Sequence, residues 1–126
     1  MAERFRGLEA SLSLERGGFF LFALFSREGS PDRWDLMVSA PWLPEDRHEA
    51  VTYLVDQIKL RLSPQDLVML SRIIVIDPAN AALQDFTRWF DVEHGRMEAH
   101  DADFFGLTVR HAVIITSKAP PAPAAA

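Results

Sequence analysis

The residues best suited to chemistry gather in one polar segment, residues 91–103. Imidazole and carboxylate groups are ligands that zinc, manganese and iron accept from proteins. The candidate metal ligands are His94, His100, Asp101 and Asp103. A divalent ion held there would serve a metal-binding module or a metal-dependent hydrolase. The spacing matches no established metal motif, so a solvated acidic loop with two surface histidines is the alternative interpretation.

Two candidates for ligand binding flank a short apolar run, residues 73–76. Asp77 follows the run directly, and ligands of sheet-and-helix proteins often bind beyond the ends of such strands. The same aspartate also suits the capping of a following helix. Arg72 precedes the run and is a candidate ligand for a phosphate or carboxylate group, or an ion-pair partner for Asp35. Both alternatives stay open at this point.

The remaining histidines and the aromatic residues favour structural roles. His111 falls on the apolar side of a predicted final strand, where we expect a hydrogen-bonded core histidine. The phenylalanines are expected in the core, because aromatic side chains dominate ordinary cores. The sequence contains no established catalytic, phosphate-binding or calcium-binding motif.

A β-hairpin over residues 17–42 is the element that must organise these side chains. Residues 19–25 form an unbroken apolar run, which is typical of a strand covered on both faces. Residues 26–33 collect turn-forming and charged residues. Residues 34–40 then alternate between apolar and more polar side chains, as in a strand with one buried face.

Helices are predicted before and after this hairpin in the sequence. Residues 2–16 carry an apolar spacing of three and four, and glycines follow as a helix end. A second helix is predicted to begin at Pro44, with an apolar stripe that ends at Leu62. Ser63 and Pro64 predict the start of a short third helix.

The second half of the chain alternates strands and helices. Residues 73–76 are β-branched and fully apolar, which predicts an interior strand. A helix follows to residue 90, and residues 107–116 predict a final strand. Residues 91–103 are polar and hard to assign, and residues 91–98 are either a tight hairpin about His94-Gly95 or an irregular loop.

The expected fold is therefore α+β, with a mixed, mainly antiparallel sheet and helices packed on it. Residues 1–117 are predicted to form a single globular domain, and residues 118–126 a disordered Ala/Pro-rich tail. The order of the strands does not follow from the sequence.

Composition narrows the possible environments and partners. The chain has 126 residues, 48% hydrophobic, with no cysteine and a formal net charge of −5. A nucleic-acid partner is unlikely for such an acidic chain, and no apolar run reaches the roughly 20 residues of a membrane span. We expect a soluble, cytoplasmic protein.

The function most consistent with these features is a non-catalytic protein-interaction or self-associating module, with another protein or a homodimer as partner. A metal-dependent hydrolase or metal-binding module that uses residues 91–103 is the alternative. No cofactor is expected beyond a possible divalent metal ion.

Overall fold

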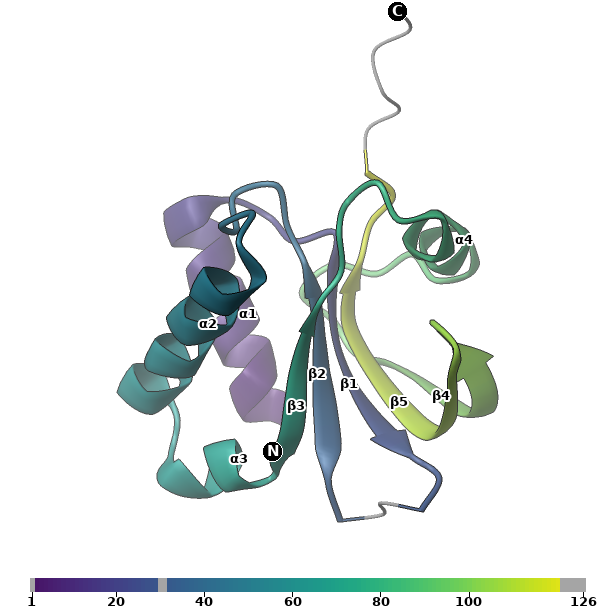
Figure 1. Ribbon diagram of the computed structural model, residues 1–126, viewed down its shortest axis with the longest axis horizontal. Helices are drawn as coiled ribbons and strands as arrows, with labels where there is room; N and C mark the ends of the chain where they lie inside the picture. The colour runs from purple at the N-terminus through teal and green to yellow at the C-terminus, as the bar shows by residue number, and fades with distance from the viewer. Residues whose placement is uncertain (1, 30–31, 121–126) are drawn as a thin grey trace, which may run out of the picture.

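The computed structural model describes residues 2–29 and 32–120, and this part contains four helices and five strands (Figure 1). The order along the chain is α1 Ala2–Arg16, β1 Leu21–Arg27, β2 Trp34–Ser39, α2 Arg47–Arg61, α3 Pro64–Val68, β3 Leu70–Val75, α4 Ala81–Trp89, β4 Met97–Phe104 and β5 Leu107–Ser117. The predicted α+β fold with a mixed, mostly antiparallel sheet is confirmed. The part of the predicted tail at residues 121–126 lies outside the described residues.

The predicted hairpin lies at the centre of the sheet. The strand order is β3-β2-β1-β5-β4, so β1 has a neighbour on each edge. β1 pairs antiparallel with β2 through Leu24↔Leu36 and with β5 through Leu24↔Val113. Six of the seven residues of β1 are buried, as expected for the apolar run that forms it.

The sheet is covered by α1, α2 and α3 on one face and by α4 on the other (Figure 1). The core under α1 and α2 contains Phe5, Leu12, Phe22, Leu54 and Ile58. The core under α4 is built around Phe25, Leu83 and Phe86. We call these two sides the three-helix face and the α4 face.

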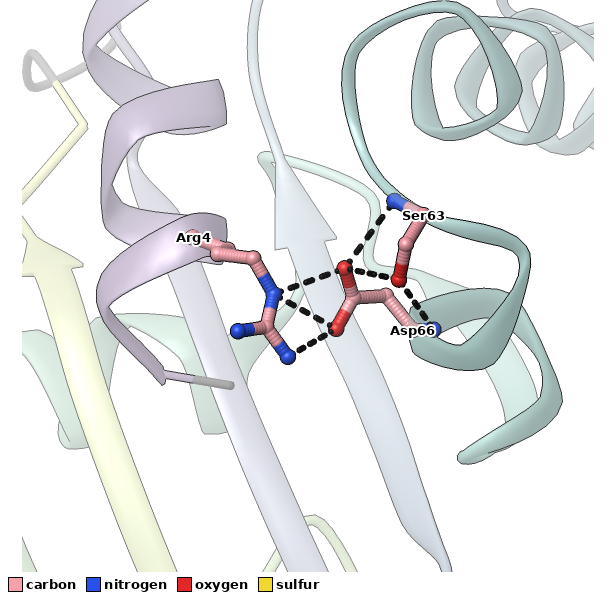
Figure 2. A network of polar contacts seen from close by, with 3 residues as sticks. All are labelled: Arg4, Ser63 and Asp66. Atoms are coloured by element: carbon pink, nitrogen blue, oxygen red, sulfur yellow. Dashed lines mark hydrogen bonds and ion pairs between the residues drawn. The ribbon is translucent and has the colours of Figure 1, made fainter.

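A polar network joins α1 to α3 on the three-helix face (Figure 2). Asp66 is buried and accepts hydrogen bonds from Arg4 Nε and Nη2, at 2.8 and 2.7 Å. Asp66 also accepts hydrogen bonds from the backbone N–H and the hydroxyl of Ser63. Ser63 and Asp66 thus form a capping box at the N-terminus of α3, where the sequence predicted the helix to start. These donors lower the pKa of Asp66, the Arg4 hydrogen bond most strongly, although burial opposes the shift.

Two helices begin later than predicted. α2 begins at Arg47, because the Asp46 carboxylate caps it by accepting from the Glu49 N–H, so Pro44 stands outside the helix. α4 begins at Ala81, where Asn80 caps it. The expected cap, Asp77, instead accepts from the Ala79 N–H in a turn before the helix.

The prediction that residues 73–76 form an interior strand was wrong. β3 lies at the edge of the sheet, where it pairs parallel with β2 alone. Ile73 and Val75 pack on the three-helix face, whereas Ile74 and Ile76 pack on the α4 face. The run is apolar because both of its faces are covered, which does not require a strand on both of its edges.

In the polar segment of residues 91–103, residues 91–96 are irregular, as one of the two alternatives predicted, and form no hairpin about His94-Gly95. Most of the segment belongs to β4, which pairs antiparallel with β5. The turn lies at Phe105-Gly106, where both residues have positive φ angles of 53° and 75°, as in a type I′ turn.

Among the described residues, no helix is long and apolar enough to cross a membrane.

Candidate functional site

Three side chains that accept metal ions meet on β4 and β5, on the three-helix face of the sheet. His100 lies directly opposite His111 in the strand pair, and Glu98 stands two residues before His100 on the same side. One possible ligand atom from each side chain lies within 4.8 Å of the other two. We call Glu98, His100 and His111 the β4–β5 triad.

Direct contacts hold the triad together. His111 Nε2 lies 2.6 Å from Glu98 Oε1, a hydrogen bond in which the imidazole N–H donates. The two imidazole rings are stacked, with centroids 4.5 Å apart and planes inclined by 17°. The hydrogen bond from His111 lowers the pKa of Glu98 most, and the charge of Arg96 lowers it further against the opposing effect of desolvation. Glu98 and His111 therefore form a hydrogen-bonded carboxylate–imidazole pair, and the His100 imidazole stacks beside it.

The environment of the triad is apolar on one side and open on the other. The Trp34 ring meets the His111 ring edge to face, with centroids 5.3 Å apart. Glu98 and His100 are exposed, and His111 is partly buried. His111 is therefore not the core histidine that the apolar pattern predicted, because its imidazole reaches the edge of the helix-covered surface.

Of the four candidate metal ligands from the sequence, the structure brings only His100 into this group. His94 lies before β4 and contacts Glu9 of α1. Asp101 faces Arg110, with 3.5 Å between Oδ1 and Nε. Asp103 lies near the turn and borders a hollow on the α4 face. These four side chains therefore do not converge on one point.

Sequence reasoning missed Glu98 and His111 as members of one group. The signal that finds them is the Phe105-Gly106 turn, because a two-residue turn there places His100 opposite His111. Alternation along β4 then places Glu98 on the same face.

The two candidate ligand-binding residues lie apart from each other. Arg72 is exposed but pairs with the buried Asp35: its Nη2 lies 2.9 Å from Asp35 Oδ2, and Arg27 Nε lies 2.7 Å from the same oxygen. The Asp35 hydrogen bond raises the pKa of Arg72. Asp77 borders a separate hollow of about 520 Å³ beyond the ends of β2 and β3, together with Arg47.

A second buried carboxylate anchors α1 on the sheet. Glu9 is fully buried and accepts a hydrogen bond from Thr116 Oγ1, at 2.5 Å from Oε2. His94 Nδ1 contacts both carboxylate oxygens and lies 2.9 Å from Oε2. The backbone N–H of His94 donates a hydrogen bond to Thr116 Oγ1, at a distance of 3.1 Å. This closed arrangement explains why His94 is not available to the triad.

The α4 face carries an apolar hollow of about 520 Å³ between α4 and β4. It is lined by Ala82, Asp85, Phe86, Trp89, Phe90, Ala99, Ala102, Asp103, Phe104 and Phe105. Trp89 stands at the end of α4 with 83% of its surface exposed. A tryptophan so exposed beside an aromatic hollow is unusual for a surface with no partner.

No protein-family model matches this sequence, and no curated protein or solved structure was found to be similar to it. Interpretation of these surfaces therefore depends on their own geometry and chemistry.

Proposed function

We propose that this domain is a protein-interaction module that associates with a second copy of itself through the surface around Trp89. We call this surface the α4–β4 patch; it comprises the residues that line the hollow between α4 and β4, together with Arg88. The observation that carries the proposal is the exposed Trp89 indole beside an apolar hollow of about 520 Å³.

Trp89 is the side chain expected to contribute most to association. A tryptophan side chain buries roughly 150–250 Å² in a contact, and tryptophans are prominent among the residues that dominate binding energy. Phe104 and Phe105 line the adjacent hollow and are only partly buried. Covering these aromatic surfaces removes apolar area from water, which favours association by about 25 cal/mol for each Å².

A second copy of the chain fits this patch because the patch is complementary to itself. It offers both a projecting side chain, Trp89, and a hollow that receives one. It also carries both signs of charge, since Arg88 is exposed beside Asp85, and Asp85 and Asp103 line the hollow. The Arg88–Asp85 ion pair is long, 3.9 Å, so the guanidinium remains free for a partner's carboxylate. In a twofold dimer, each copy would place Trp89 in the other copy's hollow.

The experiment measures the mass of the protein in solution across the micromolar range by sedimentation equilibrium. The parent is expected to be a dimer, and Trp89→Ser is expected to be a monomer with an unchanged circular dichroism spectrum. The matched control is Leu60→Ser, because Leu60 is a similarly exposed apolar residue, 77%, on a helix of the opposite face. A monomeric parent, or a Trp89→Ser variant that dimerises like the parent, contradicts the proposal.

A further inference from the structure

We propose that the β4–β5 triad of Glu98, His100 and His111 binds one divalent transition-metal ion of the zinc type. The triad lies on the three-helix face, whereas the α4–β4 patch lies on the other side of β4. The metal site is therefore independent of self-association and can be tested separately.

The strand pairing fixes the three ligands close to a binding geometry. Tetrahedral zinc has ligand bonds of about 2.1 Å, which places ligand atoms about 3.4 Å from one another. The candidate atoms already lie within 4.8 Å of each other on the antiparallel pair of β4 and β5. Rotations of the side chains alone can supply the remaining movement, so the backbone does not have to change.

The chemistry of the donors selects the class of ion. Two imidazoles and one carboxylate form a ligand set that zinc accepts, whereas magnesium and calcium prefer oxygen ligands throughout. Three protein ligands leave a fourth position for water. Copper(II) and nickel(II) belong to the same class, and the order of divalent affinities places copper above zinc.

Two features of the free protein oppose binding. The His111 hydrogen bond to Glu98 must be exchanged for two bonds to the ion, with loss of the proton on His111 Nε2. Arg96 Nε lies 3.4 Å from the other Glu98 oxygen and brings a positive charge toward the cation. Removing that charge in Arg96→Gln should therefore increase the affinity for zinc severalfold.

The test is calorimetric titration of tag-free protein with zinc chloride. We expect one zinc ion for each chain and at least a tenfold loss of affinity in His100→Ala and in His111→Ala. The matched control is His48→Ala, because His48 is an exposed histidine on α2 outside the triad. The chain contains four histidines in all, so the fourth variant, His94→Ala, completes the set.

Three results would overturn the inference. It fails if the parent binds no zinc, or if His100→Ala and His111→Ala bind like His48→Ala. It also fails if His94→Ala alone abolishes binding. Glu98→Gln provides a variant that keeps the size of the side chain and the polar contact, and it should weaken zinc binding while leaving the circular dichroism spectrum unchanged. Cobalt(II) gives a second readout, since a tetrahedral site produces visible absorption that the triad variants should lack.

Discussion

Replacing Thr116 by valine tests the buried network that anchors α1 on the sheet. Valine has nearly the shape of threonine and suits a strand, so the change removes the hydroxyl and little else. Thr116 is 1% exposed and Glu9 is fully buried. Water therefore cannot replace the lost hydrogen bond without disturbing the packing between α1 and β5.

The expected cost follows from the two contacts that Thr116 makes. Its hydroxyl donates to the Glu9 carboxylate at 2.5 Å, and hydrogen bonds to carboxylates contribute roughly 1.5–3 kcal/mol. It also accepts from the backbone N–H of His94, an ordinary hydrogen bond of about 1 kcal/mol. We expect Thr116→Val to lower the free energy of unfolding by about 3 kcal/mol. For a chain of 126 residues this corresponds to a fall of roughly 11 °C in Tm.

The assay is urea unfolding followed by circular dichroism, with calorimetry for Tm. Thr108→Val is the matched control, because Thr108 lies on the same strand but is exposed; its expected change is within about 0.5 kcal/mol. Replacing Glu9 by leucine in the Thr116→Val background should recover part of the loss, because the buried carboxylate is then also absent and the His94 imidazole, 43% exposed, can hydrogen-bond to water instead. The reasoning is refuted if Thr116→Val and Thr108→Val have the same stability.

Two further predictions concern acid stability and backbone conformation. The hydrogen bond from Arg4 holds the pKa of Asp66 in the folded protein below its unfolded value of about 3.9. The ionised carboxylate therefore stabilises the fold fully above about pH 3.9. This contribution is lost as the pH falls through the pKa of the folded state. Asp66→Asn should therefore lose less stability than the parent between neutral pH and strong acid in urea unfolding; parallel profiles would argue against the ion pair. Gly7→Ala should stabilise α1 by up to about 1 kcal/mol, since no atom lies within 4 Å of the added methyl group. Gly106→Ala should cost about 1 kcal/mol, because φ is +75° in the turn, and equal effects of the two substitutions in thermal unfolding would refute this account.

The elements most fully predicted from the sequence are those whose burial follows a simple period. The run at residues 19–25 forms the central strand, because only a strand with both faces covered tolerates so many adjacent apolar residues. The helix at residues 2–16 has the predicted bounds, since its glycine end is unambiguous. Ser63 and Asp66 form the capping box that places α3.

The features that escaped prediction depend on partners that are distant in the chain. Burial on two faces does not distinguish a central strand from a covered edge strand, so β3 was misplaced. Only half of the residues of β4 are apolar and none is β-branched, so its strand conformation depends on its pairing with β5. The choice of Asn80 over Asp77 as the cap of α4 depends on the path of the turn between them, which local residue types do not fix.

The faces to which the side chains of β5 point depend on bulges that carry no sequence signal. Between the pairs Ser26↔His111 and Arg27↔Val109, Arg110 is an extra residue on β5, and opposite it Asp101 has a φ of 51°. A regular strand would place Val109 and His111 on one face, as the alternating pattern predicted. The bulge instead turns Val109 toward the α4 face and leaves His111 on the three-helix face.

A second bulge lies near the end of β5. Ile115 is the extra residue between the pairs Ala23↔Ile114 and Phe22↔Thr116. The Thr116 hydroxyl thereby reaches Glu9 of α1, while the next residue, Ser117, donates to the Phe90 carbonyl on the α4 side. At this bulge the inserted residue moves a polar side chain onto the three-helix face, whereas the first bulge turns Val109 away from that face and leaves His111 on it. The second bulge thus directs the Thr116 hydroxyl to the anchor of α1, while the first separates Val109 from His111, which stays on the face of the triad.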